Sequence, residues 1–314
     1  MCSFYPDNPI VLPFPANSPN SQVDLQGRPL SSKKFLFAGR HGPFAFDHNG
    51  FFYRKPDLNS IDSLKQALTS AWTLTPLLFA DISEFDKYKV DKAYSYFIID
   101  GFTTDVFNNA SYSYTSTHEY ITLRVFNHLD EKQQPVYDVL CRMELYPNTH
   151  TLFAGSSHRE NVIAEFYDHG EFYNWSPVYL AAHLGVVEAD LKKKFRSSLF
   201  AEVRDPSLTR LLLKDTLYIT ETEFKSFNKF NAREKKSDLN FDRYGAPYRL
   251  CSPQELFQIF ETEKRGRLLF EYVKSSTDKF VSIYDVKDKK VIYRQYTPIS
   301  YNLKSKDLAK ILNP

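Results

Sequence analysis

The sequence predicts an α+β fold: an antiparallel β-sheet over about residues 33–154 with flanking helices, followed by a helical middle and a small C-terminal antiparallel sheet. Two observations carry this prediction. Aromatic residues make up 16% of the chain, with 27 Phe and 21 Tyr, so bulky side chains can build a large core. The central segments alternate apolar and polar residues with a period of two, and short links join them, which favours antiparallel pairing.

Composition divides the chain into three regions. Residues 1–32 are rich in proline, which fixes φ and removes a donor, and they predict an extended arm. Residues 33–156 form a β-rich domain and residues 157–314 a mixed helical and β domain, although these two regions can also form one continuous body. The arm carries Phe4, Tyr5 and other apolar residues, so we expect it to lie against the body or against a partner.

The strands of the first sheet follow from alternation. Ile121 and Leu123 alternate with polar neighbours, and so do Cys141 and Met143. The predicted strands are Lys33–Ala38, Gly50–Tyr53, Tyr94–Ile99, Glu119–Val125, Asp138–Leu145 and Thr149–Ala154. A helix that starts at Asn59 precedes the long strands, because Leu64, Leu68 and Trp72 recur at helical spacing.

After Ser157 the pattern becomes helical and then returns to strands. Thr220 and Glu223 have the spacing of a capping box, which predicts a helix before a polar loop at 231–249. Ser252, Pro253 and Glu255 give a strong helix start. The other predicted helices are Pro177–Phe200, Ser207–Leu213 and Ser305–Leu312, and the predicted C-terminal strands are Arg267–Val273, Phe280–Val286 and Val291–Tyr296.

Charge and motifs exclude several functional classes. The net charge of the chain is +2, so nucleic acid is an unlikely partner. Residues 1–156 hold 13 Lys and Arg against 16 Asp and Glu, and the remaining residues hold 27 against 22. The sequence lacks a phosphate-binding P-loop, a GxGxxG, an HExxH and a GxSxG motif, which argues against nucleotide-dependent enzymes. No cofactor and no metal are expected.

Cysteine usage and the amino-terminal residues predict a cytoplasmic protein. Three widely spaced cysteines fit free thiols in a reducing compartment. The first residues have no basic stretch before a continuous apolar run, so we expect no signal peptide. No apolar stretch approaches the roughly 18 residues that a membrane span requires, so no membrane association is expected.

A loop after the first predicted strand gives the main candidate site. Arg40-His41-Gly42 resembles the RHG tripeptide of the histidine phosphatase family, in which the His takes a phosphoryl group and the Arg holds its oxygens. The resemblance implies His158 as the second histidine, with Arg159 adding charge. It covers three residues, and that family has a mostly parallel sheet where this chain predicts an antiparallel one. The candidate catalytic residues are Arg40, His41 and His158.

Further candidates surround this tripeptide and lie on a later strand. The segment Arg40–Lys55 sets charged groups among five aromatic residues, as a pocket for a small anionic ligand requires, although its residues also fit an ordinary turn. Residues 112–120 place tyrosines and hydroxyls at strand spacing, which fits a cavity lining or a solvated β surface. The candidate substrate-binding residues are Asp47, His48, Arg54, Tyr114, His118, Tyr120 and Arg159.

Three functional classes remain open. The first is a soluble intracellular enzyme, a transferase or hydrolase, that acts on a small anionic substrate in an aromatic-lined pocket. The second is a non-catalytic protein-binding or assembly protein that uses the proline-rich arm. The third is a nucleic-acid-binding protein: residues 180–196 resemble a helix-turn-helix with its turn at Gly185 and lysines in its second helix, although a plain packing unit fits as well.

Overall fold

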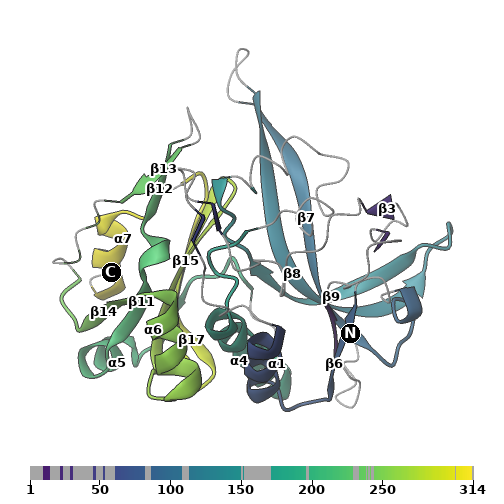
Figure 1. Cartoon of the computed structure of the whole chain (residues 1–314), viewed down its shortest axis with the longest axis horizontal. Coiled ribbons are helices and arrows are strands. Elements are labelled where there is room, and N and C mark those ends of the chain that lie inside the picture. Colours follow the sequence, from purple (N-terminus) through teal and green to yellow (C-terminus); the bar gives the residue numbers. More distant parts are fainter. Residues whose placement is uncertain are drawn as a thin grey trace. The chain divides into compact units, whose positions relative to one another are not determined.

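The structure is a computed structural model, drawn in Figure 1. It describes residues 10–14, 22–23, 29–30, 45–46, 52–53, 61–81, 86–107, 113–149, 151, 171–195, 198–228, 233–237, 239, 241, 244–300 and 302–312. The fold is α+β, as predicted. The chain forms two compact units: unit 1 contains Met1–Glu144 and His150–Glu171, and unit 2 contains Leu145–Thr149 and Phe172–Pro314.

The sheet of unit 1 is built on an antiparallel meander of three long strands. These are β7 Ser95–Phe107, β8 Ser113–Leu129 and β9 Pro135–Glu144. Asp130 closes the link between β8 and β9, since its Oδ1 accepts the backbone N–H of Gln134 at 2.8 Å. Leu123 is fully buried, in agreement with the predicted alternation. β8 extends beyond both of its predicted ends, β7 beyond its C-terminal one and β9 beyond its N-terminal one.

Two parallel strands complete this sheet. β1 Ile10–Phe14 comes from the proline-rich segment and lies between β6 Leu77–Asp81 and β7. Only Ile10 and Val11 pair with β7. Pro13 has no backbone N–H to donate, but it lies outside the paired residues, so no hydrogen bond to β7 is lost. Two short antiparallel pairs also lie in this unit: β2 Gln22–Val23 with β3 Pro29–Leu30, and β4 Ala45–Phe46 with β5 Phe52–Tyr53.

The predicted helix of unit 1 is present as α1 Ile61–Ala71. Leu64, Leu68 and Trp72 are buried at the predicted helical spacing, and Trp72 Nε1 donates to Thr75 Oγ1 at 3.0 Å. The predicted strand at 149–154 is wrong in its described part, because Thr149 and Thr151 have helical backbone. The predicted strand at 33–38 lies outside the described residues.

Unit 2 contains a six-stranded sheet in the order β10-β17-β16-β15-β11-β14. The three predicted C-terminal strands are confirmed as β15 Leu268–Ser275, β16 Asp278–Asp285 and β17 Lys290–Thr297, all antiparallel. β10 Val203–Arg204 adds to one edge in an antiparallel sense. β11 Leu217–Thr220 and β14 Tyr248–Cys251 add to the other edge in parallel.

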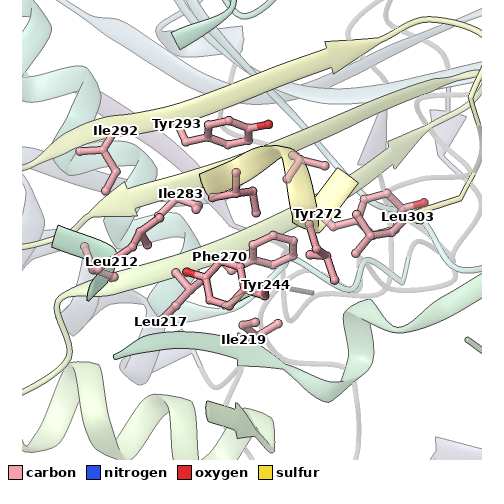
Figure 2. Close-up of a cluster of buried hydrophobic side chains, with 14 of the residues drawn as sticks. Leu212, Leu217, Ile219, Tyr244, Phe270, Tyr272, Ile283, Ile292, Tyr293 and Leu303 are labelled. Atoms are coloured by element: carbon pink, nitrogen blue, oxygen red, sulfur yellow. The ribbon is translucent and has the colours of Figure 1, made fainter. Parts of the chain in front are cut away.

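Helices cover both faces of this sheet. α5 Leu208–Lys214 and α7 Ser305–Leu312 pack on the face that carries Phe270 and Ile283. α4 Pro177–Lys192 and α6 Pro253–Phe257 pack on the face that carries Leu269 and Tyr284. α6 continues as a π-helical turn, η4 Gln258–Thr262. Figure 2 shows the apolar cluster on the first face, with Leu212, Leu217, Ile219, Tyr244, Phe270, Tyr272, Ile283, Ile292, Tyr293 and Leu303 labelled.

The predicted helix-turn-helix over residues 180–196 is wrong for the described part of that segment. α4 runs without a break through Gly185 and ends at Lys192, with Lys193 as its C-cap, and Lys194 then takes a left-handed φ of 54°. Gly185 does not form a turn, but it allows the side chain of Lys289 to lie close to the helix backbone. A Cβ at this position would lie 3.4 Å from Cγ of Lys289. The stem of Lys289 passes over this glycine, and its Nζ contacts Glu188 at 2.7 Å.

The predicted helix after Thr220 is also wrong. A short 3-10 turn, η3 Glu221–Glu223, leads into β12 Lys225–Asn228, which pairs with β13 Arg233–Lys236 inside the predicted polar loop. The side chain of Thr220 makes no capping bond, because it contacts the hydroxyl of Tyr179 at 2.9 Å instead. The helix start at Ser252 is confirmed as a complete capping box.

Candidate functional site

Most of the residues nominated from the sequence lie outside the described residues. They are Arg40, His41, Asp47, His48, Arg54, His158 and Arg159. Their convergence therefore stays a prediction. Tyr114, His118 and Tyr120 lie on β8 in unit 1, and the side chains of His118 and Tyr120 are described.

His118 and Tyr120 belong to an aromatic ladder across the meander. His118 stacks on Phe102 with ring centroids 4.7 Å apart and an angle of 15° between the planes. The guanidinium carbon of Arg142 lies 3.7 Å from the ring centroid of Tyr120. Arg142 is also ion-paired with the buried carboxylate of Glu144, so an anionic ligand here would compete with that carboxylate.

Unit 2 contains a better-defined constellation around a buried carboxylate on β15. Glu271 is 2% exposed. Asn174 Nδ2 donates to Oε1 at 2.9 Å, and the hydroxyl of Tyr284 donates to Oε2 at 2.8 Å. Nε2 of His183, on α4, lies 3.1 and 3.0 Å from the two oxygens. This arrangement suits an ionised carboxylate, which only accepts hydrogen bonds.

The pKa of Glu271 reflects two opposing effects, burial and hydrogen bonding. Burial alone would raise the pKa of its carboxyl group, but the charge of His183 and the hydrogen bonds from His183, Asn174 and Tyr284 outweigh burial and lower it. The carboxylate therefore stays charged inside the unit.

The same contacts assign the tautomer of His183. The single hydroxyl hydrogen of Tyr284 goes to Glu271, so Nε2 of His183 must carry a proton to bond the carboxylate. In the neutral ring, Nδ1 then holds the lone pair. Among the described residues no hydrogen bond reaches Nδ1, and the side chain of His183 is 15% exposed. A buried carboxylate thus orients the imidazole of His183 through Nε2.

A second buried carboxyl group, that of Glu223, hydrogen-bonds the backbone at one edge of β15. β11 pairs with β15 only at Leu217 and Tyr218, so the backbone of Phe270 and Tyr272 has no strand partner on that side. Side chains take that role: the hydroxyl of Tyr179 donates to the carbonyl of Phe270 at 3.2 Å, and the N–H of Tyr272 donates to Glu223 Oε2 at 3.3 Å. Glu223 also contacts the hydroxyl of Tyr179.

The hydrogen bonds around Glu223 can accommodate a neutral acid. Tyr179 has one hydroxyl hydrogen, and the carbonyl of Phe270 can only accept. If Glu223 is protonated, its O–H donates to Tyr179 while its other oxygen accepts from Tyr272, and every group is satisfied. Burial raises the pKa of Glu223 well above its ordinary value, and the charge of Glu271 adds to the shift. The two buried carboxyl groups thus have pKa values shifted in opposite directions.

Within the described ranges, no three His, Cys, Asp or Glu side chains lie close enough together to hold a metal ion. In the same part of the chain, no helix is both long enough and apolar enough to cross a membrane.

Comparison with protein-family models, with curated proteins and with solved structures found no match to this chain.

His183, Glu271 and Glu223 were not nominated as site residues from the sequence. Glu271 gave a usable signal, because it is the one charged residue inside the apolar run Leu268–Val273. His183 gave a weaker signal, as the one histidine of the largely apolar helix α4. Their partnership has no signal in a single sequence, since 88 residues separate them.

Proposed function

We propose that the protein is an enzyme that acts on a small anionic substrate by general acid–base catalysis, with His183 as the proton-transferring group. The single observation that carries this proposal is the contact between Nε2 of His183 and the carboxylate of Glu271. It fixes the proton on Nε2 and leaves Nδ1 as the base. A positioned histidine of this kind contributes about 10²–10⁴-fold to a reaction rate.

The proposed chemistry follows from the two ring nitrogens. Nδ1 removes a proton from a water molecule or a substrate hydroxyl as it attacks, and the resulting imidazolium is stabilised by Glu271 against Nε2. The same nitrogen then returns the proton to the leaving group. Tyr284 and Asn174 act as positioning residues, because they hold the carboxylate that orients the imidazole.

The charge of unit 2 supports an anionic substrate. Residues 145–149 and 172–314 hold 26 Lys and Arg against 18 Asp and Glu, a net charge of +8. The remaining residues, which form unit 1, hold 14 against 20, a net charge of −6. A positive unit raises the local concentration of anions and their association rate. The aromatic residues Tyr179, Tyr284 and Phe260 pack around the same face of the sheet.

The residues nominated from the sequence remain a separate candidate ligand site, proposed within unit 1. There Arg40, His41 and Arg54 would supply cations for an anionic group, and His118 and Tyr120 an aromatic surface. The assembly function of the proline-rich arm remains the alternative for a protein without catalytic activity.

Activity assays on chromogenic esters test the proposal. The panel contains p-nitrophenyl phosphate, bis(p-nitrophenyl) phosphate and a p-nitrophenyl ester with a free carboxylate. We expect turnover of at least one compound, and a loss of about 100-fold or more in kcat/KM for His183→Gln with an unchanged circular dichroism spectrum. The matched control is His128→Gln, an exposed histidine of β8, which should keep full activity. Turnover that persists in His183→Gln, or its absence from the native protein, contradicts the proposal.

A further inference from the structure

Arg294 on β17 is a buried cation on the same face of the sheet as Glu271. In the register of the sheet, Glu271 on β15 pairs with Ser282 on β16, and Ser282 pairs with Arg294. Side chains directly opposite one another in antiparallel strands point to the same face, so these three residues form one polar row. His183 of α4 contacts the first residue of this row, and Arg294, the last, is only 7% exposed. The guanidinium therefore lies inside unit 2, on the same side of the sheet as His183.

The guanidinium of Arg294 lacks the partners that a buried arginine ordinarily has. Its Nη1 donates to the carbonyl of Ser198 at 3.3 Å. Nε is buried without a hydrogen-bond partner, and no carboxylate of the described residues forms an ion pair with this side chain. By contrast, Arg267 in the same unit contacts the carboxylates of three Asp residues. A buried charge is costly without a counter-ion, so an anion is the complement that Arg294 requires.

Glu271 does not supply that counter-ion directly. Its two oxygens accept from Asn174 and Tyr284 and contact His183. Two strand spacings, about 10 Å, separate the backbones of Glu271 and Arg294. Burial and the charge of Glu271 raise the pKa of Tyr284 well above its ordinary value, and the positive charge of Arg294 opposes this rise. Arg294 therefore lies near the tyrosine whose hydroxyl contacts His183 at 3.2 Å.

Aromatic side chains lie beside Arg294 on this face. Phe280 pairs with Tyr296, which is two residues along β17 from Arg294. Phe200 packs on both rings, with its centroid 5.9 Å from that of Phe280 and 5.1 Å from that of Tyr296. Phe200 is 48% exposed, so this aromatic group extends from the interior to the surface of the unit. Arg294 thus lies next to a part of the face that solvent reaches.

We propose that Arg294 binds the anionic group of the substrate, a carboxylate or a phosphate, beside His183. A guanidinium binds the paired oxygens of either group through two parallel N–H bonds, and the edge of Arg294 that includes Nε has no protein partner among the described residues. The bond to Ser198 holds the guanidinium in place for such a contact. An anion bound there lies close to Tyr284, so only a small substrate would also reach the imidazole. The role of Arg294 as a substrate contact rests on the proposed function.

Titration with simple anions tests the site and needs no turnover. Inorganic phosphate and, separately, acetate are added to the full-length native protein, and the ¹⁵N signals of the His183 ring, assigned with His183→Gln, are followed by NMR. Sodium chloride at matched ionic strength controls for screening. We expect at least one of the two anions to shift these signals saturably, and the one that binds more tightly identifies the group that Arg294 accepts. No saturable shift with either anion would overturn the proposal.

Substitution of two arginines locates the binding. Arg294→Met should weaken anion binding at least tenfold, because the edge with two donors is lost. The matched control Arg210→Met removes the same charge from an exposed position on α5 and should leave the dissociation constant unchanged. Equal affinities of the native protein and Arg294→Met would overturn the proposal.

Thermal stability separates a ligand contact from a structural residue. A buried cation without a counter-ion destabilises the fold, so Arg294→Met should melt at the same temperature as the native protein or at a higher one when no anion is added. A clearly lower melting temperature would assign Arg294 to the support of the fold and overturn the proposal.

The ester assays distinguish the failure of this proposal from the failure of the catalytic one. If the native protein turns over an ester and Arg294→Met keeps the full kcat/KM, Arg294 does not contact the substrate, while the role of His183 stands. If anion binding depends on Arg294 but no ester is turned over, the catalytic proposal fails and Arg294 remains an anion site.

Discussion

Nε2 of His183 lies 3.0 Å from one carboxylate oxygen of Glu271 and 3.1 Å from the other, so a side chain of α4 and a side chain of β15 are hydrogen-bonded under the helix. Tyr284, opposite Leu269 on the neighbouring strand β16, donates to the same carboxylate and determines which way the histidine proton points. The fold of unit 2 thus places an acid–base group at a defined position on one face of its sheet.

The first prediction concerns Glu271→Gln. The amide cannot accept all the donors that the carboxylate accepts, so unfolding free energy at pH 7 should fall by about 2–3 kcal/mol, as for a lost charged hydrogen bond. Because the folded-state pKa of Glu271 is lowered, its stabilisation is present above the ordinary value of 4.5 and is lost as pH falls through the folded value. Urea denaturation should therefore show the difference between variant and native protein shrinking on acidification. A constant difference would contradict an ionised Glu271.

Glu223→Gln should behave in the opposite way. A glutamine amide reproduces the donor and the acceptor of a neutral carboxylic acid, so the variant should match the native protein near pH 5. The folded-state pKa of Glu223 is raised, so its contribution is fully present below 4.5 and is lost as pH rises through the folded value. The variant should accordingly gain stability relative to the native protein as pH increases to 8. Destabilisation at pH 8, measured by urea denaturation, would mean that Glu223 is ionised.

Two glycines should respond oppositely to alanine. A Cβ at Gly266 would lie 2.7 Å from atoms of the buried Phe260 ring, so Gly266→Ala should lower the melting temperature. At Gly185, inside α4, the new methyl meets only the stem of Lys289 at 3.4 Å, and alanine improves helix propensity by about 0.8–1 kcal/mol. Gly185→Ala should therefore be neutral or stabilising in a thermal melt. Marked destabilisation by Gly185→Ala would indicate a turn there.

The buried ion pair Lys279–Asp307 joins β16 to α7 with an Nζ–Oδ2 distance of 2.6 Å. Lys279→Met leaves the buried carboxylate of Asp307 without its ion-pair partner and should lower the free energy of unfolding by about 3–5 kcal/mol. Adding Asp307→Asn removes that charge while its side-chain oxygen still accepts the backbone N–H of Lys304, so the double variant should recover most of the loss. A double-mutant cycle of unfolding free energies, measured by chemical denaturation, gives the coupling energy of the two residues. Additive losses of stability from the two substitutions would argue against a desolvated ion pair.

The elements that the sequence predicted well are those whose signals are local. Ser252, Pro253 and Glu255 specify a helix start within four residues, and the structure has the complete capping box. The alternation around Leu123 identifies a strand because one face is buried. Thr220 and Glu223 have the same capping signature, yet their side chains bond Tyr179 and the backbone of Tyr272, which lie far away in the sequence. Tertiary contacts overrode the local pattern there.

The candidate site illustrates the same limit. Glu271 stands out within an apolar run, which indicates a buried charge in need of partners. The sequence does not identify those partners, because Asn174, His183 and Tyr284 come from three separate parts of the chain. His118 and Tyr120 were nominated from strand spacing, and the structure places both in one aromatic ladder.

The protonation pattern of His183 is the most direct test of the account. Long-range ¹H–¹⁵N correlation spectra of protein labelled in its imidazole nitrogens report which ring nitrogen carries the proton, and His183→Gln assigns the signal. In the neutral ring, the account predicts a protonated Nε2 and an unprotonated Nδ1, with the preference lost in Glu271→Gln. A neutral ring protonated on Nδ1, or a pattern unchanged by Glu271→Gln, would contradict the claim that Glu271 holds His183 as a base.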